Sequence, residues 1–106
     1  MGIDDTLARE LVRRVLLASR PDKIILFGSA ASGEMTRDSD IDLLIVENEP
    51  VRRHDRAVAI RDAIGDVGWP VDVLIIAPER FERTKDVIGG IAYPANKYGR
   101  VLYEAA

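Results

Sequence analysis

Two aspartates, Asp40 and Asp42, lie two residues apart at the start of the apolar run Ile41–Val46. This run is apolar at alternating positions on both faces, which is typical of a strand covered on both sides. Because side chains alternate along a strand, the two carboxylates would project from the same face with Cα atoms about 6.6 Å apart. Carboxylates placed in this way can bind divalent cations, and their hard oxygen atoms favour Mg²⁺ or Mn²⁺ over zinc.

A third carboxylate, Asp72, interrupts a second apolar run, Val71–Ala77, and could complete the same ligand set. Without a cation, two carboxylates held near 4 Å would repel by about 4 kcal/mol at an effective dielectric constant of 20. The alternative is structural: Asp40 caps a turn, Asp42 is hydrogen-bonded at a strand end, and Asp72 accepts from a backbone amide. Considered alone, Asp72 is better explained by this structural role than by cation binding. The Asp40/Asp42 pair favours a cation, since ionised carboxylates are rarely buried unpaired.

A possible phosphate site precedes the paired aspartates. Gly28 and Ser29 follow the apolar run Ile24–Phe27 and open a short helical turn. Bare backbone amides and the positive end of a helix attract phosphate, and Ser29 adds a hydroxyl donor, although a tight turn with a capping serine explains such a pair equally simply. The segment lacks the Gly-x-Gly-x-x-Gly pattern, and Glu34 follows Gly33 where a P-loop has lysine. Dinucleotide-type and P-loop binding are therefore not supported.

Alternating helices and strands are expected to position these residues within one α/β domain, residues 1–106. The roughly 12 residues between the first two strands are barely enough for a parallel crossover, which favours a small mixed sheet of about four strands with flanking helices. The expected elements are a helix from Asp4 to before Pro21, strands at Ile24–Phe27, Ile41–Val46 and Val71–Ala77, a helical turn before Gly33, a long helix from Val51 to before Gly65, a helix from Pro78, a short helix before Gly99 and an edge strand at Arg100–Glu104.

Three further residues receive ordinary structural interpretations. Tyr93 is expected to be extended because Pro94 follows it. His54, the only histidine, stands among arginines near a helix start and is expected to be solvated. Trp69 is expected to cover the core rather than to stack on a base.

Composition narrows the function classes. The chain has 106 residues, of which 47% are hydrophobic and 31% charged, with 15 Lys and Arg against 18 Asp and Glu. The net charge of −3 argues against direct binding to a nucleic-acid backbone. The chain has no cysteine, which fits a reducing cytoplasm, and no apolar run long enough to cross a membrane.

The arrangement Gly28-Ser29, ten residues, then Asp40-Ile41-Asp42 resembles the G-S-x(10)-D-x-D signature of the DNA polymerase β nucleotidyltransferase superfamily. The wider strings Leu26–Gly33 and Asp38–Leu44 resemble the minimal nucleotidyltransferases, or MNT proteins, and the likeness covers nearly the whole chain, with Gly99–Glu104 similar to the usual ending of the family. This resemblance implies the nucleotidyltransferase fold. Asp72 falls where the family has its third carboxylate.

One residue departs from the family pattern. Ser32 stands where many members have arginine before the glycine of the loop, and Arg37 is the candidate replacement. The resemblance implies transfer of a nucleoside monophosphate, expected to be AMP, from ATP or another NTP with release of pyrophosphate. It implies two Mg²⁺ ions, with Mn²⁺ as a possible substitute. The implied catalytic and metal-binding residues are Asp40, Asp42 and Asp72, and the implied nucleotide-binding residues are Gly28, Ser29 and Ser39.

The size of the chain leaves no room for a separate acceptor-binding domain, so a protein acceptor is expected. Minimal proteins of this kind often resemble the antitoxin of HEPN/MNT toxin–antitoxin pairs, in which the MNT protein adenylylates a tyrosine of the HEPN ribonuclease. The leading hypothesis is therefore a cytoplasmic antitoxin with a HEPN-type partner. Two alternatives remain open: a non-catalytic binding module of the same fold, and a small-molecule nucleotidyltransferase that acts as a homo-oligomer.

Overall fold

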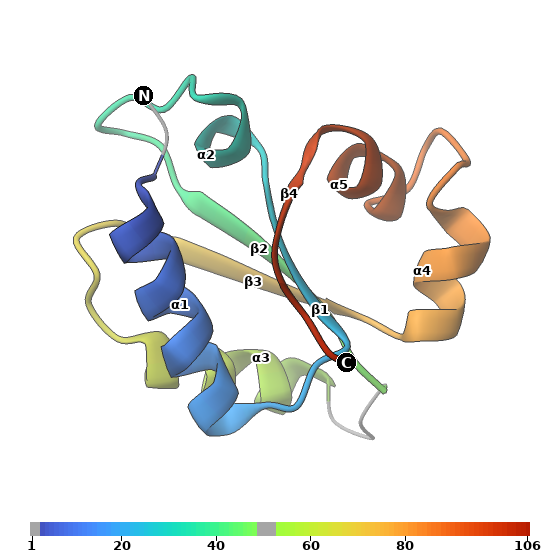
Figure 1. Ribbon diagram of the computed structural model, residues 1–106, viewed down its shortest axis with the longest axis horizontal. Helices are drawn as coiled ribbons and strands as arrows, with labels where there is room; N and C mark the ends of the chain where they lie inside the picture. Colours follow the sequence, from blue (N-terminus) through green and yellow to red (C-terminus); the bar gives the residue numbers. More distant parts are fainter. Residues whose placement is uncertain (1–2, 49–52) are drawn as a thin grey trace.

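The computed structural model describes residues 3–48 and 53–106, which form a mixed four-stranded sheet with helices on both faces (Figure 1). The expected α/β architecture is confirmed. The predicted start of the long helix at Val51 lies outside the described residues. In chain order the elements are α1 (Asp5–Ala18), β1 (Lys23–Phe27), α2 (Ser29–Ser32), β2 (Ile41–Val46), α3 (Arg53–Ile64), β3 (Val71–Ile76), α4 (Pro78–Thr84), α5 (Ala92–Tyr98) and β4 (Arg100–Glu104).

The strands are arranged in the order β3-β2-β1-β4. β1 is antiparallel to both β2 and β4, whereas β2 and β3 are parallel and are connected through α3. The short connection between β1 and β2 is too short to carry a parallel crossover, which explains the antiparallel pairing. The two pairings of β2 bring the end of β1 and the starts of β2 and β3 to the same end of the sheet.

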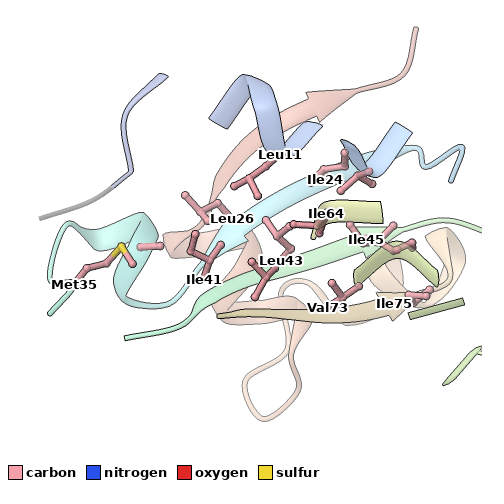
Figure 2. Packing of buried hydrophobic residues seen from close by; sticks show 14 residues of the cluster. Leu11, Ile24, Leu26, Met35, Ile41, Leu43, Ile45, Ile64, Val73 and Ile75 are labelled. Atoms are coloured by element: carbon pink, nitrogen blue, oxygen red, sulfur yellow. The ribbon is translucent and has the colours of Figure 1, made fainter. Parts of the chain in front are cut away.

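One face of the sheet packs against α1 and α3. Because side chains alternate along each strand, every second residue points into this layer, and together they form the larger core cluster (Figure 2). Arg14 ties the two helices together, since its Nη1 donates to the carbonyl oxygen of Ile64 at 2.5 Å. The cluster includes Leu11, Ile24, Leu26, Ile41, Leu43, Ile45, Ile60, Ile64, Val73 and Ile75.

The opposite face is covered by α4 and α5. Phe81 and two alanines of α5 pack on the remaining strand residues, which form the second cluster: Ile25, Leu44, Val46 and Ile76. Gly99 allows α5 to lie directly on β1, because a Cβ at this position would come within 2.7 Å of Ile25 Cγ2. The helix is thereby held next to the strand that leads into Gly28.

Two expectations about local structure are wrong. Tyr93 is helical, because Pro94 lies in the first turn of α5, where a backbone N–H has no partner within the helix and its loss costs nothing. The run Val71–Ala77 is apolar on both faces apart from Asp72, a pattern that predicts a strand covered on both sides. Instead β3 is an edge strand, and the side chain of Leu74 on it is 44% exposed.

Other expectations hold. His54 is exposed at the start of α3, and Trp69 is half-buried against the larger core cluster. Among the described residues, no helix has the length and apolar character that crossing a bilayer requires.

Candidate active site

Asp42 and Asp72 are neighbours across the sheet. In the parallel pairing of β2 with β3, Asp42 is in register with Asp72, and in the antiparallel pairing of β1 with β2 it is in register with Phe27. Register partners project from the same face of a sheet, so Phe27, Asp42 and Asp72 form one row of side chains. Asp42 is half-buried in this row, whereas Asp72 is exposed at the sheet edge.

Asp40 lies in the exposed segment directly before β2. Its charge reaches the row: burial raises the pKa of Asp42, and the negative charges of Asp72 and then Asp40 raise it further. All three carboxylates predicted from the sequence therefore belong to one electrostatic cluster, since a nearby like charge disfavours the ionised form of a carboxyl group.

Gly28 connects this cluster to the start of α2. Its φ of +72° is in the left-handed region, and a Cβ at this position would lie 2.5 Å from Asp42 Oδ2. Glycine is therefore required both by the backbone conformation and by the carboxylate. The amides of Ala31 and Ser32 donate to the carbonyl oxygen of Gly28, whereas the amides of Ser29 and Ala30 begin the helix and have no acceptor within it.

The Gly-Ser turn and the acidic cluster are thus in contact at one end of the sheet. The family model for the nucleotidyltransferase domain matches residues 5–93, which contain this whole arrangement. The chain belongs to the nucleotidyltransferase domain family.

Two solved structures share the fold of this nucleotidyltransferase domain. One is a candidate nucleotidyltransferase from Sulfolobus solfataricus, with a TM-score of 0.63 and 22% identity over 94% of this chain and 79% of that chain. The other is a toxin–antitoxin structure with AMP-PNP, with a TM-score of 0.61 and 17% identity over 92% of this chain and 73% of that chain. No curated protein matches the sequence.

The acidic cluster of this nucleotidyltransferase domain suits a divalent cation by the chemistry of its donors. Carboxylate oxygens are the ligands that Mg²⁺ and Mn²⁺ prefer. Within residues 3–48 and 53–106, no positively charged side chain forms an ion pair with Asp40, Asp42 or Asp72, and burial and the negative charges of Asp72 and Asp40 raise the pKa of Asp42. In the same described ranges, no three acidic or histidine side chains are grouped closely enough to hold a metal ion as they stand. Joint binding of an ion by all three aspartates therefore requires their side chains to turn towards one another.

Ser39 closes the turn that leads into β2. Its Oγ accepts a hydrogen bond from the Thr36 amide at 2.9 Å, and its own amide donates to the Thr36 carbonyl oxygen at 3.0 Å. Met35, next to this turn, is buried in the core and anchors it. These contacts fix the backbone immediately before Asp40. The nucleotide-binding role expected of Ser39 stays a prediction.

Ser32, which replaces the arginine of many family members, donates through its Oγ to the carbonyl oxygen of Ser29 at 3.3 Å. It therefore stabilises the short helix α2 without supplying a positive charge. Arg37, the candidate replacement, is exposed in the loop between α2 and β2.

Phe27 and Leu74 were missed by sequence reasoning. Phe27 adjoins Asp42 on one side of the row, and Leu74 follows Asp72 on the same face two residues later. The alternation in each strand assigns both residues to a face. Their relation to the carboxylates depends on which strands pair and in what register, and no local pattern encodes that.

Proposed function

We propose that this protein transfers AMP from ATP to a tyrosine hydroxyl of a HEPN-type ribonuclease toxin and so acts as its antitoxin. The observation that carries the proposal is the contact between two motifs at one end of the sheet: Gly28 adjoins the Asp42 carboxylate, and Asp42 adjoins Asp72 in the sheet register. A nucleotidyltransferase needs a phosphate-binding turn next to acidic ligands, and the proposal is supported by the Gly-Ser turn that lies beside carboxylates at this end of the sheet.

In the proposed reaction the phenolic oxygen of the acceptor loses its proton and forms a bond to the α-phosphorus of ATP. The bond from that phosphorus to the oxygen bridging to the β-phosphate breaks, and pyrophosphate leaves. Bound Mg²⁺ would supply activation of the attacking oxygen and stabilisation of the leaving group. Asp40 and Asp42 would hold both ions, and Asp72 would bind on the acceptor side and receive the proton.

The donors of the Gly-Ser turn are proposed to bind the β- and γ-phosphates. The amides at the start of α2 and the Ser29 hydroxyl are hydrogen-bond donors of the kind that binds phosphate oxygens. Ser39 is proposed to join them after its turn adjusts to the nucleotide. Ser32 is uncharged and bonds to the Ser29 carbonyl oxygen. The metal ions would therefore compensate most of the negative charge of the phosphates.

Two observations support a protein acceptor. The fold is shared with a toxin–antitoxin structure that contains AMP-PNP. Asp72, on the acceptor side, is exposed on an edge strand, where a large partner can approach it.

The test uses ATP labelled at the α- or the γ-phosphate, Mg²⁺ and the co-expressed HEPN-type protein. We expect label on a partner tyrosine from α-labelled ATP only, and its loss in Asp40→Asn. Asp38→Asn is the matched control, because Asp38 is an exposed aspartate of the same loop outside the cluster. Equal transfer by wild type and Asp40→Asn would overturn the proposed mechanism.

The same proteins separate the alternatives. Toxin neutralisation that survives loss of both the Asp40 and Asp42 carboxylates would indicate a non-catalytic binding module. Turnover of an aminoglycoside or a sugar phosphate without a protein acceptor would indicate a small-molecule nucleotidyltransferase, and the activity would then depend on self-association.

A further inference from the structure

The free edge of β3 presents backbone hydrogen-bonding groups beside Asp72. The amide of Ile41 donates to the Pro70 carbonyl oxygen at 2.8 Å, and the amide of Glu47 donates to the Ile76 carbonyl oxygen at 3.1 Å. In a parallel ladder, alternate residues bond to one side, so Asp72 and Leu74 direct their N–H and C=O groups towards β2. The intervening residues Val71, Val73 and Ile75 direct theirs outward, where the sheet ends.

The row that contains the acidic cluster ends at this edge. Phe27, Asp42 and Asp72 occupy successive strands in register, and the next position would belong to a strand outside β3. Neighbouring strands lie about 4.8 Å apart, and register partners project from the same face. A residue of an added strand opposite Asp72 would therefore stand directly beside its carboxylate. A tyrosine side chain at this position is longer than an aspartate side chain. Its hydroxyl would therefore extend further from the sheet than the carboxylates, on the side where the nucleotide is proposed to bind.

The residues of β3 are not of the kinds that usually block strand addition. β3 reads Val-Asp-Val-Leu-Ile-Ile and contains neither lysine nor proline. Its single charge is Asp72 itself. Leu74 is 44% exposed on the same face as Asp72, whereas its register neighbour Leu44 on β2 is fully buried. An apolar side chain of an added strand would cover Leu74.

We propose that the acceptor protein binds as a fifth strand along the free edge of β3, with its tyrosine opposite Asp72 and an apolar residue opposite Leu74. The inference rests on the proposed function and adds the manner in which the acceptor is recognised. Main-chain hydrogen bonds to Val71, Val73 and Ile75 supply affinity, and the two side-chain positions supply specificity. Recognition of an extended segment along this edge would place a hydroxyl beside Asp72.

A second copy of this chain is the competing occupant. Self-pairing of β3 would place the copy's own strand against Asp72, and that strand contains no serine, threonine or tyrosine. Such a dimer would close the acceptor position without providing a hydroxyl. The acceptor segment is therefore the occupant that fits the proposed activity.

The direct test is amide hydrogen exchange of the full chain with and without the HEPN-type acceptor protein. We expect the amides of Val71, Val73 and Ile75 to become at least about tenfold more protected on binding, because outward amides would gain partners. The amides of Asp72 and Leu74, which already bond to β2, serve as internal references. Transfer of AMP without protection of the outward amides would overturn the edge inference alone.

Kinetics provide the second test. Leu74→Gln removes the apolar contact with the acceptor strand without adding a charge beside Asp72, and we expect its KM for the acceptor to rise about tenfold with kcat and Mn²⁺ binding unchanged. The control is Leu17→Gln, because Leu17 is 70% exposed on α1, which packs on the other face of the sheet. Equal KM values for the two variants would contradict the inference.

The remaining outcomes are also decisive. Absence of AMP transfer by the wild-type protein would overturn the proposed function, whether or not the outward amides of β3 become protected from exchange. Protection of Val71, Val73 and Ile75 in the chain alone, together with a dimer in sedimentation, would assign the edge to a second copy and overturn the acceptor inference.

Discussion

The carboxylate of Asp42 occupies the space that any side chain at position 28 would need. A Cβ on Gly28 would lie 2.5 Å from Asp42 Oδ2, closer than real Cβ atoms approach an oxygen. The glycine of the Gly-Ser turn and the second aspartate of the Asp-x-Asp pair are therefore one packing unit. A side chain at position 28 would therefore displace the Asp42 carboxylate.

Substitution of Gly28 should be more damaging than positive φ alone explains. Gly28→Ala adds backbone strain and the clash with Asp42, and we expect it to lower the free energy of unfolding by about 2–4 kcal/mol. Gly33→Ala is the matched control: φ is +81° there, but nothing lies within 4 Å of its Cβ position. We expect a loss of about 1–2 kcal/mol for the control in urea unfolding. Equal losses would contradict the importance of the clash.

Neutralising Asp42 should stabilise the metal-free protein. Its pKa is raised in the folded state by burial and by Asp72 and Asp40, so ionisation at neutral pH opposes folding. We expect Asp42→Asn to raise Tm by about 2–4 °C at pH 7, a small effect because the group is partly exposed. The difference should shrink as the pH falls through the raised pKa of Asp42, and vanish only below the ordinary pKa of an aspartate, where the wild-type carboxyl is protonated in the folded and the unfolded state alike. A lower Tm for the variant at pH 7 would show that the carboxylate is structural.

Mn²⁺ should reverse that order of stability. An ion that binds only the folded protein stabilises it by about 2.7 kcal/mol at 100 times its Kd, and we expect this gain for the wild type but not for Asp42→Asn. Calorimetric titration should also show Mn²⁺ affinity falling as the pH is lowered, because protons compete for the carboxylates. Since the pKa of Asp42 is raised, the fall should begin at a higher pH than for an ordinary aspartate. Equal Mn²⁺ heats for both proteins would exclude Asp42 as a ligand.

Arg14 should contribute more to stability than its neighbour Arg13. Arg14 bonds to the Ile64 carbonyl oxygen at the end of α3 and to Glu10, whereas Arg13 bonds within α1 to Glu10 and its side chain is 62% exposed. We expect Arg14→Ala to cost about 1–3 kcal/mol, because it leaves a part-buried carbonyl oxygen without this donor. Arg13→Ala should cost less than about 0.5 kcal/mol in the same thermal unfolding experiment. Similar losses would show that the contact with α3 contributes little.

Local patterns predicted several elements closely. The strand Ile41–Val46 has the expected bounds because its residues are apolar on both faces apart from Asp42, and the edge strand Arg100–Glu104 is also confirmed. The common face expected of Asp40 and Asp42 stays a prediction, because Asp40 precedes β2 and only Asp42 lies in the strand. The Gly28-Ser29 turn was predicted from its position between an apolar run and small helix-forming residues.

Long-range pairing explains what the sequence could not show. The adjacency of Asp42 and Asp72 depends on the register of a parallel crossover, for which residue spacing carries no signal, so the sequence offered it only as an expectation. The edge position of β3, and with it the exposure of Leu74, likewise depends on strand order. For Tyr93, the preference of a residue before proline for an extended conformation predicted the wrong structure, because Pro94 lies in the first turn of a helix, where proline is tolerated.

The antiparallel pair β1–β2 has a consequence for biosynthesis. Gly28, Asp40 and Asp42 all belong to this pair or its connecting segment, whereas Asp72 arrives only when α3 has crossed over and β3 has docked. Contacts close in sequence form faster than distant ones. A chain leaving the ribosome can therefore assemble the glycine turn and two acidic groups early, but a chain that stops within α3 never acquires the third. We expect nascent and truncated chains to be inert as transferases until the parallel strand is in place.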